Sequence, residues 1–181
     1  MIGQYKRDLS VVPYRSEWKD LYKREADLLR SVLGEKALQI EHIGSTSIPG
    51  MMAKPIIDMM VAVVSLAQAT ELIPEIEALG YIYKPHDTIP ERVYFAKEHA
   101  PEHRTHHLNL AELESGFWKN QLAFRDHLRA HDNIAGEYVD LKKRIAEEYA
   151  QTHQLDLEAK SEFVARVLEL AEEDGGKVSR K

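Results

Sequence analysis

The chain of 181 residues contains no cysteine. This absence excludes a disulfide scaffold, a cysteine nucleophile and a thiolate zinc site, and it is typical of a reducing cytosol. Long apolar runs are also missing, because the longest, at 55–64, is interrupted by Asp58 and is too short to cross a bilayer. The first residues lack the apolar core of a signal peptide. We therefore expect a cytoplasmic protein that does not enter the membrane.

An excess of positive charge and the common phosphate-binding motifs are absent as well. The net charge is -6, so nucleic acid is not attracted to the chain as a whole and any polyanion needs a local basic cleft. No Gly-x-Ser-x-Gly, Gly-x-Gly-x-x-Gly or Walker A spacing occurs. Serine hydrolases and the classical dinucleotide and P-loop sites are therefore not indicated. No feature of the sequence indicates an oligomeric state.

Hydrophobic periodicity predicts one domain of the α+β class over residues 1–174, with a mixed sheet supporting helices. The sheet layer is expected over about 37–110, a helical flank over about 111–174, and a disordered tail at 175–181. The expected strands cover 37–43, 55–64 and the segments GYIYKP, RVYFAK and THHLNL. The expected helices cover 16–33, 66–79 with a break at Pro74, 118–131, 134–153 and 157–173.

A turn-rich segment, GSTSIPG at 44–50, directly follows an expected strand. Its small residues, hydroxyls and backbone N–H groups have the composition of a loop that holds an anion, and a plain tight turn has the same composition. Basic side chains elsewhere either add charged donors to a phosphate or are simply solvated. The candidate phosphate- or ligand-binding residues are Gly44, Ser45, Thr46, Ser47, Lys54, Arg92 and Arg104.

Asp58 interrupts the apolar run of the expected central strand. An unpaired buried charge is costly, so this carboxylate either accepts hydrogen bonds from a neighbouring loop such as GSTS or serves a metal or phosphate site. Histidines are crowded between residues 86 and 107, and strand alternation places His107 and Asn109 on one face. Their spacing matches no standard zinc motif, and surface histidines are the alternative.

Three separated motifs resemble those of the GrpB family: IEHIGSTSIPGMMAKPIIDMMV at 40–61, RTHHLNL at 104–110 and FRDHLRAH at 124–131. They occur in the family's order, and the resemblance extends from about Val12 to Leu168. It implies a nucleotidyltransferase-like fold. It also implies similarity to the C-terminal domain of some dephospho-CoA kinases.

The resemblance has consequences for the site. In active nucleotidyltransferases a Gly-Ser motif holds the phosphates and two carboxylates one residue apart bind the metals; Gly44, Ser45 and Asp58 match this pattern. Met60 stands where the second carboxylate is expected, and a thioether is a poor ligand for Mg²⁺. Asn109 follows His107 where the family usually has a second histidine. The expected catalytic and metal residues, for Mg²⁺ or another divalent ion, are Asp58 and His107, with Glu41 or His42 as a further metal ligand.

Three functions are compatible with these residues. The first, which we expect, is binding of a nucleotide or phosphorylated small molecule with degenerate transferase activity. The second is an active metal-dependent nucleotidyltransferase or phosphohydrolase that uses a single metal. The third is a regulatory domain that binds a partner through its helical flank. For the first two, we expect Asp58 and His107 to meet across adjacent strands and face the turn, with Lys54, Arg92 and Arg104 lining the same cleft.

Overall fold

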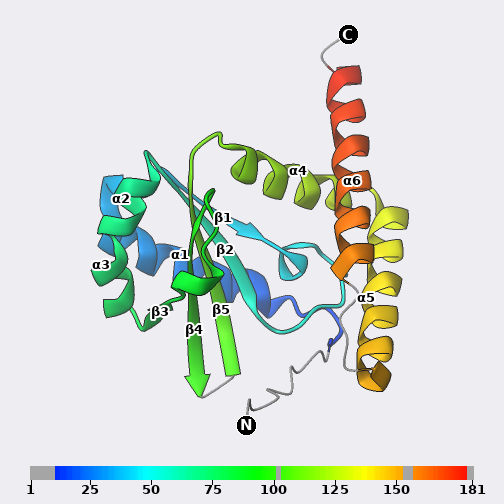
Figure 1. Cartoon of the computed structure of the whole chain (residues 1–181), viewed down its shortest axis with the longest axis horizontal. Coiled ribbons are helices and arrows are strands. Elements are labelled where there is room, and N and C mark those ends of the chain that lie inside the picture. Colours follow the sequence, from blue (N-terminus) through cyan, green and yellow to red (C-terminus); the bar gives the residue numbers. More distant parts are fainter. Residues whose placement is uncertain (1–10, 101–102, 153–156, 179–181) are drawn as a thin grey trace.

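Five strands form one mixed sheet in the order β1-β2-β5-β4-β3 (Figure 1). The computed structural model describes residues 11–100, 103–152 and 157–178. The central pair, β2 and β5, runs parallel, and every other neighbouring pair is antiparallel. The strands are β1 (Gln39–Ile43), β2 (Ile57–Val63), β3 (Tyr81–Tyr83), β4 (Val93–Ala100) and β5 (His103–Glu112).

Three helices cover one face of the sheet, and their apolar side chains build the main core against it. Side chains at alternate positions of β2, such as Met59 and Val61, pack there with Trp18 and Leu29 of the first helix. These strand residues have no exposed surface, as expected for a nearly continuous apolar run in a central strand. The three helices are α1 (Glu17–Leu33), α2 (Leu66–Glu71) and α3 (Ile73–Ala78).

The other face is covered by the helical flank. Trp118 of α4 (Gly116–Ala130) packs on Met60 and Ala62 of β2. The last two helices, α5 (Asp132–Thr152) and α6 (Leu157–Val178), stand beside the sheet on the side away from α2 and α3 (Figure 1). They form a second cluster with α4, and this cluster includes Ile48 and Met51 from the chain that follows β1. The flank is therefore packed directly onto the turn-rich segment.

The α+β class and the expected strands are confirmed, and the helix expected at 66–79 is divided between α2 and α3 with Pro74 in the first turn of α3. Asp58 is the second residue of β2, at the start of the strand. One expectation differs from the structure. The helix α6 extends to Val178, so residues 175–178 are helical where a disordered tail was expected. Residues 179–181, and His153 at the end of one expected helix, lie outside the described residues.

No helix in the described part of the chain combines the length and the apolar character needed to cross a bilayer.

The packing of β5 gives a test of the core. Leu108 has no exposed surface, and replacing it by alanine leaves a cavity between the sheet and the first three helices. We expect Leu108→Ala to lower the free energy of unfolding by about 2–5 kcal/mol, measured by urea denaturation. The matched control Leu38→Ala, at a position 43% exposed, is expected to change it by less than about 1 kcal/mol. Equal losses in the two variants would contradict this account of the core.

Candidate functional site

Asp58 and His107 form a hydrogen-bonded pair across the two parallel central strands. The register of β2 and β5 places the two residues side by side, and His107 Nδ1 lies 2.8 Å from Asp58 Oδ1. Because an ionised carboxylate only accepts hydrogen bonds, Nδ1 carries the proton, and in the neutral ring Nε2 then carries the lone pair. His107 Nε2 is buried and has no hydrogen-bond partner among the described residues. The expected meeting of these two side chains is therefore present.

The Gly44 turn closes over the same carboxylate. Gly44 has a φ of 67°, and a Cβ atom added there would lie 2.3 Å from Asp58 Oδ2. Only glycine lets the backbone approach the carboxylate this closely while adopting that conformation. Asp58 thus has one oxygen against His107 and the other against the turn, which accounts for a carboxylate at the edge of an apolar strand.

Two hydroxyls of the turn are occupied by the protein itself. Thr46 Oγ1 donates to the carbonyl of Ile56 at 3.3 Å and lies 3.0 Å from His42 Nε2. Ser47 Oγ donates to the carbonyl of Gly44 at 2.6 Å. Both residues are buried, and these hydrogen bonds of their hydroxyls hold the turn in shape. Ser45 is half-buried and its hydroxyl faces α5.

Lys142 of α5 is the hydrogen-bond partner of Ser45, and Lys142 was not identified from the sequence as a candidate site residue. Its Nζ donates to Ser45 Oγ at 3.2 Å and to the carbonyl of Met52 at 2.6 Å. Burial, with a smaller contribution from nearby Lys160, lowers the pKa of Lys142 to about 8, and Asp58 acts in the opposite direction. This electrostatic influence places Asp58 near α5, and the same carboxylate contributes to the raised pKa of Tyr138. A run of three basic residues at 142–144 suggested only a solvated helix face.

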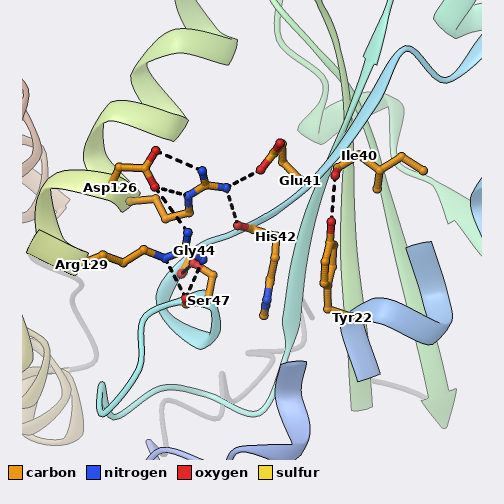
Figure 2. A network of polar contacts seen from close by, with 9 residues as sticks. Tyr22, Ile40, Glu41, His42, Gly44, Ser47, Asp126 and Arg129 are labelled. Atoms are coloured by element: carbon orange, nitrogen blue, oxygen red, sulfur yellow. Dashed lines mark hydrogen bonds and ion pairs between the residues drawn. The ribbon is translucent and has the colours of Figure 1, made fainter. Parts of the chain in front are cut away.

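Two arginines of α4 tie this helix to β1 and the turn (Figure 2). Arg125 Nη1 donates to Glu41 Oε2 at 2.6 Å and to the carbonyl of His42 at 3.0 Å. Arg129 donates to the carbonyl of Ser47 through Nε and Nη2, at 3.1 and 2.8 Å. Glu41 is therefore committed to an ion pair with Arg125, which argues against its expected role as a metal ligand.

His42 lies on the opposite face of the sheet from Asp58. In the register of β1 and β2, Ile43 pairs with Asp58 and His42 pairs with Met59, whose side chain points into the main core. The His42 ring stacks on Tyr22 with ring centroids 4.7 Å apart. Burial lowers the pKa of His42 to about 4. The expectation that it joins Asp58 in a metal site is therefore wrong.

The two expected arginines lie around Tyr94, whose ring meets that of His107 edge-on at 5.7 Å. The guanidinium of Arg92 lies 4.6 Å from the Tyr94 ring centroid, and its Nη1 is buried without a hydrogen-bond partner among the described residues. Arg104 forms an ion pair with Glu98 at 3.6 Å and also influences the pKa of Tyr94. Lys54 lies half-buried between the turn and β2.

The residues present do not fit a two-metal centre. Met60 has no exposed surface and packs against Trp118, so no second carboxylate stands beside Asp58 on β2. Asn109, its neighbour on β5, donates to the carbonyl of Met59 at 3.2 Å. Of the histidines crowded in the sequence, His86, His99 and His103 are exposed, and only His107 reaches Asp58.

A cavity of about 380 Å³ lies behind the turn, on the α1 side. Neither Asp58 nor His107 lines it. Its lining includes Tyr14, Lys19, Tyr22, Lys23, His42 and Arg129.

The Gly44 turn can be tested with a second glycine of positive φ. Gly50 has a φ of 78° but open space where a Cβ would lie. Alanine at either position pays about 1–2 kcal/mol of backbone strain, and only Gly44→Ala also drives a methyl group into Asp58. We expect Gly44→Ala to be less stable than Gly50→Ala by at least about 1 kcal/mol in urea denaturation. Equal stabilities would show that Asp58 does not lie against the turn.

The pKa of His42 predicts a pH-dependent stability. Its folded-state pKa of about 4 lies below the ordinary value of 6.5, so as the pH falls His42 becomes protonated in the unfolded chain before it does in the folded protein. Stability is fully present above about pH 6.5 and declines as the pH falls toward 4, by about 3 kcal/mol in total. We expect the unfolding free energy of His42→Gln to fall less steeply between pH 7 and 4.5 than that of the wild type. His86→Gln, at an exposed site, is the control, and parallel curves for His42→Gln and the wild type would contradict the assignment.

The chain is similar to part of several longer proteins. The protein is 30% identical to the dephospho-CoA kinase of Mycobacterium leprae over 152 aligned residues. This alignment covers 70% of this chain and 37% of the kinase. Among solved structures, the Cid1 poly(U) polymerase in its MgATP-bound mutant form aligns with a TM-score of 0.49 and 13% identity, over 69% of this chain and 41% of that one.

Relatives with higher sequence identity identify the family of this chain. UPF0157 protein YqkA of Bacillus subtilis is 38% identical over 88% of this chain, which spans about half (46%) of that protein's length. Glutamate-rich protein GrpB of Alkalihalophilus pseudofirmus is 34% identical over 93% of this chain and 98% of its own. The crystal structure of GrpB from Enterococcus faecalis has a TM-score of 0.78 and 34% identity, over 90% of this chain and 96% of that one. Because the family model described as GrpB protein matches residues 8–170, the chain belongs to the GrpB family.

Proposed function

We propose that this protein binds a phosphate group of a nucleotide or phosphorylated metabolite at the Gly44–Ser45 turn, without two-metal nucleotidyl transfer. The observation that carries the proposal is the contact of Lys142 Nζ with Ser45 Oγ. It places a half-buried ammonium group directly on a Gly-Ser turn. An ammonium has three donors, and two are accounted for by Ser45 and the carbonyl of Met52, so one can serve a ligand.

The hydrogen bonds of Lys142 leave its charge without an anionic acceptor, and the nearby Asp58 carboxylate is the opposing charge at the turn. The acceptors of the Lys142 hydrogen bonds are both neutral, and burial lowers its pKa, so an incoming phosphate would stabilise the charged form. A hydrogen bond between charged partners contributes about 1.5–3 kcal/mol where water is excluded. Arg92 packs on Tyr94, whose ring contacts His107, and its buried Nη1 lacks a hydrogen-bond partner among the described residues.

A second candidate function rests on His107 Nε2. With Nδ1 held by Asp58, this nitrogen keeps a lone pair and has no hydrogen-bond partner in the described residues. Such a carboxylate–histidine pair suits a general base, or one ligand of a single metal, in a phosphohydrolase. Under this alternative, the purified wild type hydrolyses a phosphate ester and Asp58→Asn abolishes that hydrolysis. A wild type that binds the phosphate ester without hydrolysing it argues against this second function.

The proposal predicts a specific loss of phosphate affinity. We expect Lys142→Met to weaken the binding of inorganic pyrophosphate, measured by calorimetry in the presence of EDTA, by at least about tenfold, since that factor corresponds to 1.4 kcal/mol. The matched control is Lys143→Met on the next, exposed position of α5, whose affinity should stay within about twofold of wild type.

Affinity for pyrophosphate should also fall as the pH rises past about 8, because the ammonium of Lys142 then loses its proton. Equal weakening by Lys142→Met and Lys143→Met, or no binding to the wild type, would overturn the proposal.

A further inference from the structure

Two histidines of α4 face one aspartate of α6. His127 and His131 are four residues apart and therefore project from the same side of the helix. His127 Nδ1 and His131 Nε2 each lie 3.5 Å from Asp174 Oδ2. The three residues offer ligand atoms that all lie within 4.8 Å of one another.

These separations suit a tetrahedral transition metal. Zn²⁺ binds imidazole nitrogen and carboxylate oxygen at about 2.0–2.2 Å, which in a tetrahedron separates the ligand atoms by roughly 3.4 Å. Both nitrogen–oxygen distances, at 3.5 Å, agree with that value. The two rings are stacked with centroids 4.0 Å apart, so binding of both nitrogens to one ion requires the rings to turn out of the stack. His131 is part-exposed and has room to turn.

The hydrogen bond of His131 fixes which nitrogen is available. Its Nδ1 lies 2.9 Å from the backbone carbonyl of His127, and a carbonyl only accepts, so Nδ1 carries the proton. In the neutral ring, Nε2 then directs a lone pair at the Asp174 carboxylate. Two lone pairs facing each other require a cation or a proton between them. A backbone bond on the opposite ring nitrogen is also how metal-binding histidines are usually oriented.

The burial of the cluster leaves one open side. The His127 side chain is 5% exposed, whereas those of His131 and Asp174 are 39% and 44% exposed. His127 Nε2 is buried and has no hydrogen-bond partner among the described residues, so hydrogen bonding does not explain why this imidazole is buried. A metal held by three side chains here would take water as its fourth ligand from the exposed side.

We propose that His127, His131 and Asp174 bind a divalent transition metal of the zinc class, which joins α6 to α4. Two imidazoles and one carboxylate favour Zn²⁺, Co²⁺ or Ni²⁺ over Mg²⁺, which prefers oxygen ligands. The same helix α4 carries Arg125 and Arg129, which hold β1 and the turn. A metal at this position would therefore restrain the helical flank relative to the Gly44–Ser45 turn, whether or not phosphate binds there.

The test uses the full chain without a histidine tag, stripped with EDTA and titrated with Zn²⁺ and Co²⁺ in a calorimeter. We expect one site, and we expect His131→Gln and Asp174→Asn each to weaken it by at least about tenfold. Two control variants should leave this metal affinity unchanged. His86→Gln alters an exposed histidine outside the cluster, and Asp58→Asn removes the β2 carboxylate that pairs with His107.

A second measurement on the wild type keeps the proposal testable if a variant fails to fold. Addition of Co²⁺ should broaden the imidazole NMR signals of His127 and His131 and spare those of His86. The proposal is overturned if the wild type takes up no metal, if the two ligand variants bind as tightly as the wild type, or if the broadening centres on His107.

Discussion

The carboxylate of Asp58 is the group around which the site is arranged. It lies half-buried at the start of an apolar central strand, and it accepts a hydrogen bond from His107 Nδ1 at 2.8 Å. That bond requires β2 and β5 to be parallel neighbours in one register. The close approach of the turn to the second oxygen requires a glycine at position 44. One carboxylate thus specifies a strand pairing, a ring orientation and a backbone conformation.

The helical flank supplies the positive charge that this arrangement lacks on the sheet. Arg125 and Arg129 of α4 hold β1 and the turn through backbone carbonyls, and Lys142 of α5 contacts Ser45. Because Met60 is packed against Trp118, the face beside Asp58 is apolar where a second carboxylate would bind metal. The site therefore combines a Gly-Ser turn with protein cations, a composition that suits phosphate binding better than two-metal phosphoryl transfer.

Most of the fold follows from the sequence because its signals are local. Alternation and apolar runs locate the strands, and Pro74 locates the break between α2 and α3. The Asp58–His107 contact was also predictable, since both residues lie in motifs resembling one family. Lys142 and the His127–His131–Asp174 cluster were not identified. Their partners lie far away in sequence, 97 residues in the case of Ser45, and a charge run or two histidines on a helix look the same when they are merely solvated. The hydroxyls of Thr46 and Ser47 bond within their own turn, and composition does not distinguish such a hydroxyl from one that faces a ligand.

The central claim is that phosphate binds at the turn through Lys142 and needs no metal. The most direct measurement is an NMR titration of the labelled protein with inorganic pyrophosphate in the presence of EDTA. The account predicts that the largest shift changes occur at the Ser45 amide and the Lys142 side chain. It is contradicted if those signals stay in place, if they move only after Mg²⁺ replaces the EDTA, or if the changes centre instead on Lys19 and Lys23 at the cavity behind the turn.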